Sequence, residues 1–119
     1  MDEEKNAAEQ IRAHAERNHS LLEALSQKGV PLEEPRSIEL HFWVLGRTNA
    51  AHLGQALYKK GHVVLYLAPA TVKADGTVWN VESGIRLSPY QVADAAFTAD
   101  LVSMAREFAG SYDGWGTSV

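Results

Sequence analysis

The first strong pattern in the sequence is helical. Residues 2–27 contain neither proline nor glycine and are rich in Ala, Glu, Leu and Arg, which favour helices. Their apolar side chains recur every three, four or seven residues and so form one stripe that needs a covering surface. This predicted stripe consists of Ala8, Ile11, Ala15, Leu22 and Leu25. Lys28 and Gly29 predict the helix end, since glycine accepts a left-handed conformation and a cation suits the negative end.

A strand with a strict period of two follows a proline-bearing linker at residues 31–35. Over residues 37–45, four apolar side chains alternate with Glu39, His41 and Trp43. This alternation places the apolar set on a core face and the second set on the opposite face. The predicted core set is Ile38, Leu40, Phe42 and Val44.

The middle of the chain predicts a helix followed by a hairpin. Apolar residues at helical spacing predict a helix over residues 48–60. Residues 62–70 are nearly all apolar, which predicts a strand covered on both faces. The pair Asp75-Gly76 is a strong turn signal, so residues 77–87 are predicted to return as the second strand of a hairpin.

The last third of the chain predicts a helix and a short strand. Ser88-Pro89 followed by Gln91 has the form of a capping box, and apolar residues continue at helical spacing as far as Ala109. Gly110 is predicted to stop this helix. Residues 111–117 are aromatic and rich in turn formers, and they could add one edge strand.

The order of these elements predicts the fold. A strand-helix-strand-strand-helix-strand series is a split βαβ pattern, which gives a ferredoxin-like α+β sandwich with two helices on one face of an antiparallel sheet. The leading helix, residues 1–28, is an extra element that could cover the open face of the sheet around Trp43 and Tyr66. With the α+β core at residues 37–117, it is expected to form a single domain over residues 1–119.

Composition and charge narrow the functional classes. The 119 residues are 45% hydrophobic and 22% charged, as in an ordinary soluble domain. Fifteen acidic and eleven basic side chains give a formal charge of -4, and no basic cluster exceeds Lys59-Lys60. This argues against direct nucleic-acid binding, which depends on clustered positive charge. Without cysteines, a signal core or a membrane-length apolar stretch, we expect a cytoplasmic protein that is not bound to a membrane.

The sequence shows no pattern typical of a metal site, a cofactor or catalysis. His14 and His19 are five residues apart, which separates their directions on a helix by about 140°. The other histidines lie on different predicted elements: His41, His52 and His62. GxSxG, GxxxxGK[ST] and GxGxxG motifs are absent. Four carboxylates remain acid-base candidates that only burial would perturb: Asp94, Asp100, Glu107 and Asp113. We therefore expect no enzyme activity, no metal and no cofactor.

Three aromatic residues on predicted strands, Trp43, Tyr66 and Trp79, form a candidate interaction surface. Aromatic side chains on a sheet can anchor a protein partner or stack nucleic-acid bases. Three interpretations stay open: burial within the chain, a partner or self-association surface, and base stacking. The lack of adjacent basic residues disfavours base stacking.

The most distinctive motif is Tyr112-Asp113-Gly114-Trp115-Gly116. It resembles the ending of the RraB family, the regulators of ribonuclease activity B, and looser agreement extends over residues 20–117. The resemblance implies a ferredoxin-like fold and a bacterial protein that binds ribonuclease E and restrains it. Residues 117–119 lack the Asp/Glu-rich tail that follows this motif in the strongly acidic family regulator.

The motif also has a physical interpretation of its own. Asp113-Gly114 can bend the chain, while Tyr112 and Trp115 can anchor a terminus that would otherwise fray. Contact with a partner is the other role open to these residues, since Trp and Tyr are favoured interface anchors.

Together these observations favour a non-catalytic, RraB-like domain that modulates a partner protein, such as a ribonuclease, by masking a surface. The alternative is a small enzyme or ligand-binding domain with a pocket between the sheet and the helices. Residues 62–70 would lie at a sheet edge in the ferredoxin-like order, which also predicts a homodimer.

Overall fold

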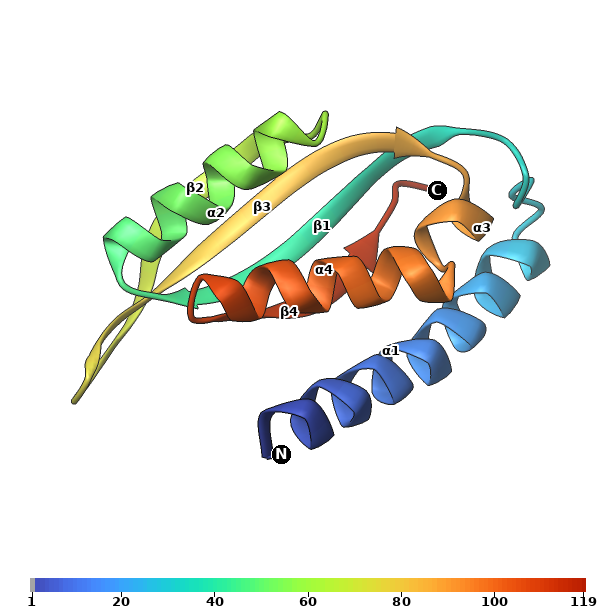
Figure 1. Ribbon diagram of the computed structural model, residues 1–119. Helices are drawn as coiled ribbons and strands as arrows, with labels where there is room; N and C mark the ends of the chain where they lie inside the picture. Colours follow the sequence, from blue (N-terminus) through green and yellow to red (C-terminus); the bar gives the residue numbers. More distant parts are fainter. Residues whose placement is uncertain (1) are drawn as a thin grey trace.

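Four antiparallel strands form one sheet in the order β2-β3-β1-β4 (Figure 1). The computed structural model describes residues 2–119, so Met1 of the predicted leading helix lies outside the described residues. The strands are β1 (Arg36–Leu45), β2 (Val63–Lys73), β3 (Gly76–Leu87) and β4 (Gly110–Gly116). The helices are α1 (Asp2–Gln27), α2 (Arg47–Lys59), α3 (Pro89–Val92) and α4 (Ala95–Glu107). This arrangement confirms the predicted ferredoxin-like α+β sandwich, including the hairpin and the terminal edge strand.

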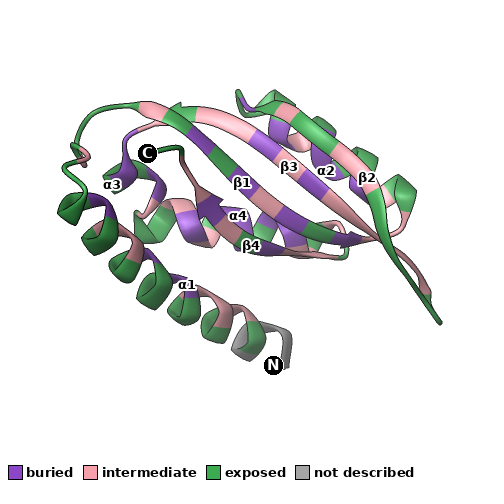
Figure 2. Ribbon diagram, turned by 180° about the vertical axis from the view of Figure 1, so that it is seen from behind, coloured by how far each residue is buried: buried purple, intermediate pink, exposed green. Residues whose placement is uncertain are grey.

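The hydrophobic core lies between one face of the sheet and helices α2 and α4 (Figures 1 and 2). The predicted alternation of β1 is confirmed, because its four apolar side chains on this face are all buried: Ile38, Leu40, Phe42 and Val44. The helices contribute matching apolar side chains, among them Leu53, Leu57, Leu101 and Val102. Each such side chain contributes about 1.5–3 kcal/mol relative to its exposed state.

The helix predicted after Ser88 is divided into two. Ser88 Oγ accepts from the Gln91 N–H at 3.1 Å and Gln91 Oε1 accepts from the Ser88 N–H at 2.9 Å, which confirms the capping box. However, α3 ends at Val92, and Asp94 caps a new helix by accepting from the Phe97 N–H at 3.1 Å. The first amides of a helix have no partner within the helix, and the Asp94 carboxylate accepts from one of them. This contact stabilises the start of α4.

The end of α4 also differs from the prediction. The residue in the left-handed region is Ala109, with a φ of +57°, whereas Gly110 already belongs to β4. Gly110 is required for a different reason, because an added Cβ would lie 2.7 Å from the Trp43 carbonyl oxygen and 2.9 Å from Val44 Cγ2. A glycine at this point therefore lets β4 lie close against β1.

The strand β2 lies at the edge of the sheet, as the ferredoxin-like order predicts, but one of its faces is exposed. The apolar run over residues 62–70 predicted cover on both faces, and this prediction is wrong. The described helices lie on the other side of the sheet, so Val63, Leu65 and Tyr66 remain exposed (Figure 2). An apolar run reports the preference of the side chains and does not identify the part of the chain that would cover them.

Helix α1 packs beside α4 near β4 and does not cover the sheet face that carries Trp43 and Tyr66 (Figure 1). The predicted stripe is confirmed in part, because Ile11, Leu22 and Leu25 pack against the core. Ala8 and Ala15 are exposed, and over residues 6–27 the buried side chains of α1 are those of His14, Asn18 and Leu25. Two polar side chains thus take positions that hydrophobic periodicity assigns to apolar ones.

These two polar side chains attach α1 to β4 through hydrogen bonds. His14 Nε2 donates to the Tyr112 carbonyl oxygen at 2.8 Å, and Trp115 Nε1 donates to Asn18 Oδ1 at 2.8 Å. Arg17 donates to His14 Nδ1 at 3.1 Å, which fixes His14 as a neutral ring with its proton on Nε2. Burial, and second to it the charge of Arg17, lower the pKa of His14 below its usual 6.5.

A β-bulge allows both aromatic rings of β4 to face inward. Tyr112 and Trp115 are three residues apart, but their partners on β1 are two residues apart, which leaves Asp113 as an extra residue. Gly114 has a φ of +111°, a conformation that favours glycine. The Tyr112 ring stacks on the His14 ring with 4.6 Å between centroids. The bend predicted at Asp113-Gly114 is therefore confirmed.

The close contact at Gly110 generates a stability prediction. We expect Gly110→Ala to lower the free energy of unfolding by about 1–3 kcal/mol in urea denaturation, because β4 must move away from β1. The matched control on the same strand is Gly116→Ala, where an added Cβ meets nothing within 4 Å. This control is expected to change stability by no more than about 0.5 kcal/mol. An equal loss in the two variants would contradict the prediction.

His14 generates a pH prediction. The unfolded chain binds a proton at His14 near the usual pKa of 6.5, whereas the folded chain resists protonation because that pKa is lowered. The resulting stabilisation is fully present above pH 6.5 and is lost as the pH falls through the lowered pKa. We therefore expect the urea midpoint to decrease between about pH 7.5 and about pH 5.5.

The pH prediction has a matched pair of variants. His14→Gln retains an N–H for the Tyr112 carbonyl but cannot titrate, so the pH-dependent loss should become smaller. His19→Gln changes an exposed residue on the same helix and should leave the loss in place. Part of the pH-dependent loss of stability should remain in His14→Gln, because the pKa of His62 is lowered too. Burial is the main cause of that shift, and the charge of Lys60 is the second. The same loss in His14→Gln and the unmodified protein would disprove the assignment.

Candidate interaction surface

The open face of the sheet consists of the side chains that alternate with the core positions (Figure 2). Paired residues on antiparallel strands point to the same face, so the register defines the members of this surface. They include Glu39, His41 and Trp43 of β1, Asn80, Glu82 and Gly84 of β3, and Val63, Tyr66 and Ala68 of β2.

Four large apolar side chains on this face are accessible to solvent. Their exposed fractions are 62% for Val63, 53% for Leu65, 52% for Tyr66 and 39% for Trp43. A bulge between Val64 and Tyr66 brings Leu65 onto this face, where it extends over Gly84. Scattered exposed apolar residues are normal, but a group on one sheet face is typical of an interaction site. We call this group, Trp43, Val63, Leu65 and Tyr66, the open-face cluster.

Negative charge adjoins the open-face cluster. His41 Nδ1 lies 3.2 Å from Glu82 Oε1, and His41 Nε2 lies 3.9 Å from Glu39 Oε2. The two carboxylates thus flank one imidazole on the central strands of the sheet. A partner whose apolar patch is bordered by Lys or Arg would complement this arrangement.

Trp79 does not belong to the same surface as Trp43 and Tyr66, although the three were predicted together. It pairs with Val44 and Pro69, and it packs against the core from the helical side of the sheet. The period of two along β3 contains the signal for this placement, because Trp79 shares its face with the buried Val81.

The motif at residues 112–116 lies mainly inside the molecule. Tyr112 and Trp115 are buried, and their backbone or side-chain groups bond to α1. Burial raises the pKa of the Tyr112 hydroxyl, which keeps it neutral. Of the motif's longer side chains, that of Asp113 is exposed, so this residue is the one that a partner could reach.

The acid-base candidates do not converge on a common site. Asp94 caps α4, and the Asp100 carboxylate lies 3.9 Å from Lys60 Nζ. Glu107 and Asp113 are exposed. Within the described part of the chain, no three His, Cys, Asp or Glu side chains are placed to hold a metal ion. None of the described helices is long and apolar enough to cross a membrane.

Comparison with known proteins identifies the family. A search of curated proteins gave no match. The family described as RraB, regulator of ribonuclease activity B, matches residues 15–117, which include all four strands and the motif at residues 112–116. The match covers most of the 119 residues, and the chain therefore belongs to the RraB family.

Proposed function

We propose that this chain regulates a ribonuclease by binding it through the open face of the sheet, and that it performs no catalysis itself. The observation that carries this proposal is the exposure of the open-face cluster on a sheet whose other face is covered by helices. Membership in a family described as regulators of ribonuclease activity supports a ribonuclease as the partner.

The cluster has the composition of a protein contact. Trp43 and Tyr66 are large rigid side chains, which are the types that contribute most to binding when an interface buries them. Val63 and Leu65 extend the apolar area along β2. At about 25 cal/mol for each Å² buried, covering such a group supplies part of the association energy, while charged residues at the rim set the orientation.

The charge of the surface supports the type of partner. A ribonuclease binds a polyanion, so the surface that holds its RNA substrate carries basic side chains. Glu39 and Glu82 beside the open-face cluster would attract such a surface, and the chain carries a formal charge of -4. We propose that the chain masks a basic surface of a bacterial ribonuclease, with ribonuclease E as the first target to test, in the cytoplasm.

The proposal predicts which substitutions weaken binding to purified ribonuclease E. Replacing Trp43 or Tyr66 by Ser should raise the Kd by about thirtyfold, the effect of losing a contact worth about 2 kcal/mol. Tyr66 is 52% and Trp43 39% exposed, so both variants should remain folded, with Trp43→Ser losing the more stability in urea. Isothermal titration calorimetry would measure the affinity, and an RNA cleavage assay would measure the inhibition.

The matched control for these variants is Tyr58→Ser. Tyr58 is an exposed aromatic residue on α2, on the helical side of the sheet, and its substitution should leave both affinity and inhibition unchanged. If Tyr58→Ser weakens binding as strongly as Tyr66→Ser, the open face is not the contact surface. If the unmodified chain binds no ribonuclease, the proposed target is wrong.

Self-association through β2 is a separate prediction. The position of β2 at the sheet edge exposes backbone groups to a second chain. However, Pro69 lacks an N–H, and β2 has register shifts between Val64 and Tyr66 and between Pro69 and Thr71. These features interrupt the edge, so a dimer would need the open-face cluster as well. Light scattering should then show a dimer that Tyr66→Ser dissociates, and a monomer at high micromolar concentration would contradict the prediction.

A further inference from the structure

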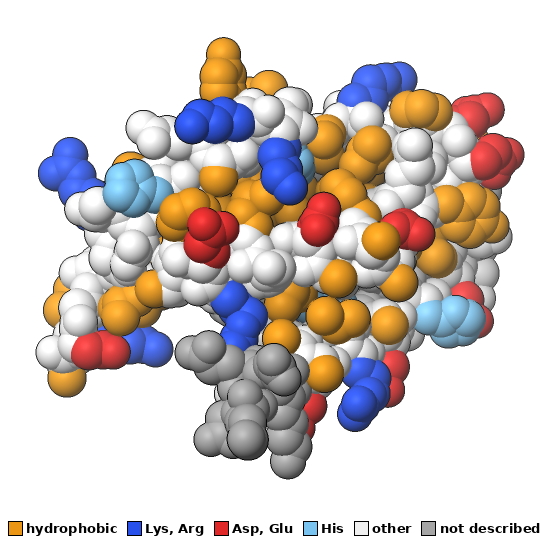
Figure 3. Space-filling view, viewed as in Figure 1, with side chains coloured by type: hydrophobic (Ala, Val, Ile, Leu, Met, Phe, Trp, Pro, Cys, Tyr) orange, Lys and Arg blue, Asp and Glu red, His pale blue; other side chains and the backbone are white. Residues whose placement is uncertain are grey.

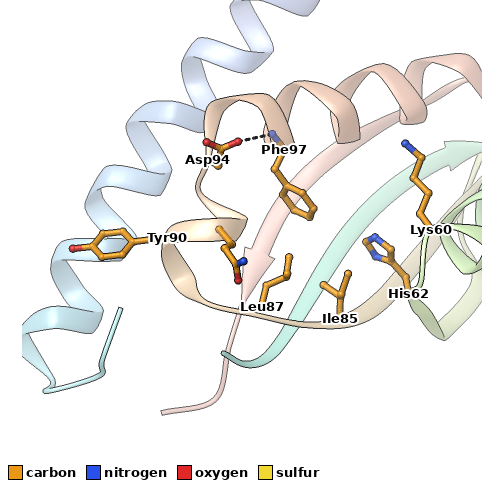
Figure 4. A pocket seen from close by; sticks show the side chains of 8 residues that line it. Lys60, His62, Ile85, Leu87, Tyr90, Asp94 and Phe97 are labelled. Atoms are coloured by element: carbon orange, nitrogen blue, oxygen red, sulfur yellow. Dashed lines mark hydrogen bonds between the residues drawn. The ribbon is translucent and has the colours of Figure 1, made fainter. Parts of the chain in front are cut away.

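A groove lies on the helical side of the sheet, between the end of α2 and the α3–α4 junction (Figure 4). Its volume is about 490 Å³. The floor is apolar, because Ile85 and Leu87 rise from β3 and the Phe97 ring points down toward them from α4 (Figure 4). Figure 3 shows hydrophobic side chains gathered in the middle of this side of the molecule, with charged side chains around them.

The groove exists because the two helices do not close over β3. The chain leaves α2 at Lys59 and turns at Gly61, which has a φ of +93°. On the opposite side, the break between α3 and α4 separates the helical cover into two pieces. Ile85, Leu87 and Phe97 are consequently only partly buried, although they pack against the core.

The basic side chains of the groove lie at one of its ends. Lys60 and His62 lie there side by side (Figure 4). His62 is 4% exposed, and its Nδ1 lies 3.3 Å from the hydroxyl of the fully buried Ser83. This contact fixes the ring and leaves Nε2 as the atom that can bond to a ligand. The imidazole, held by a serine, is a buried polar group beside the apolar floor, and Gln91 and Asp94 line the groove away from it.

The charged side chains make the two ends of the groove different. Lys60 Nζ lies 3.9 Å from the Asp100 carboxylate, and both side chains are more than half exposed. Such an exposed ion pair is weak, so Lys60 can also bind the anionic group of a ligand. The Asp94 carboxylate stands away from this end and would repel an anion (Figure 4). Because burial, and then Lys60, lower the pKa of His62, this imidazole supplies a hydrogen bond rather than a charge at neutral pH.

We infer that this groove binds a small organic anion with an apolar body, independently of the function proposed above. The apolar body lies against Ile85, Leu87 and Phe97. The acid group lies at Lys60, with His62 Nε2 within reach as a hydrogen-bond donor. The volume falls within the range of small-molecule sites, and the lining combines an apolar floor with polar side chains that can orient a ligand.

The first test uses anilinonaphthalene sulfonate, an aromatic anion whose fluorescence rises in apolar surroundings. The full chain should bind one molecule of this probe, and Lys60→Glu should weaken binding by about tenfold because attraction becomes repulsion. The matched control is Lys73→Glu, the same charge change at the exposed end of the β2–β3 hairpin. Absence of probe binding by the unmodified chain would overturn the inference, as would equal losses in the two variants.

A second measurement separates the groove from the open-face cluster. Combining Trp43→Ser with Tyr66→Ser should leave the probe affinity unchanged, whereas loss of binding in that variant would place the probe on the open face and overturn the inference. Amide shifts in nuclear magnetic resonance spectra should change for residues around His62, Ile85 and Phe97. Because the open-face variants are expected to weaken ribonuclease binding and to spare probe binding, each proposal can fail without the other.

Discussion

The strict alternation of β1 determines both faces of the sheet. This strand pairs with β3 on one side and β4 on the other, so its buried side chains hold three strands in register. Because Phe42 and Val44 face the core, Trp43 between them must face away from it. A shift of one residue would bury Glu39 and His41 and expose the core. The exposed tryptophan is thus a consequence of the same alternation that stabilises the fold.

The position of α1 leaves the open face accessible. The bulge at Asp113-Gly114 turns Tyr112 and Trp115 inward, where the Tyr112 backbone carbonyl accepts from His14 and the Trp115 indole N–H donates to Asn18 of α1. These bonds fix α1 beside α4. A buried polar group without a partner costs about 1–3 kcal/mol, so moving α1 to the open face would leave several groups unsatisfied. The hydrogen bonds therefore give a direction to the packing of α1 that its apolar contacts, such as that of Leu25, do not specify alone.

The sequence predicts the features that local signals encode, and it does not predict which element covers which surface. The alternation of β1, the capping box at Ser88 and the hairpin at Asp75-Gly76 each act within a few residues, and each is confirmed. The uncovered face of β2 and the burial of His14 depend instead on distant partners. The break at Asp94 lies between these cases, since an aspartate three residues before Phe97 is a local cap that a continuous helical pattern obscured.

The strand β3 contributes to both proposed sites, and its geometry keeps them apart. Glu82 faces His41 on the open side, and the next residue, Ser83, faces His62 beside the groove. A protein on the open face and a ligand in the groove would thus contact different side chains of one strand. A change of register between these faces is opposed by the fully buried Val81, which would turn toward solvent. The two proposed sites therefore share a strand but present different side chains to their ligands.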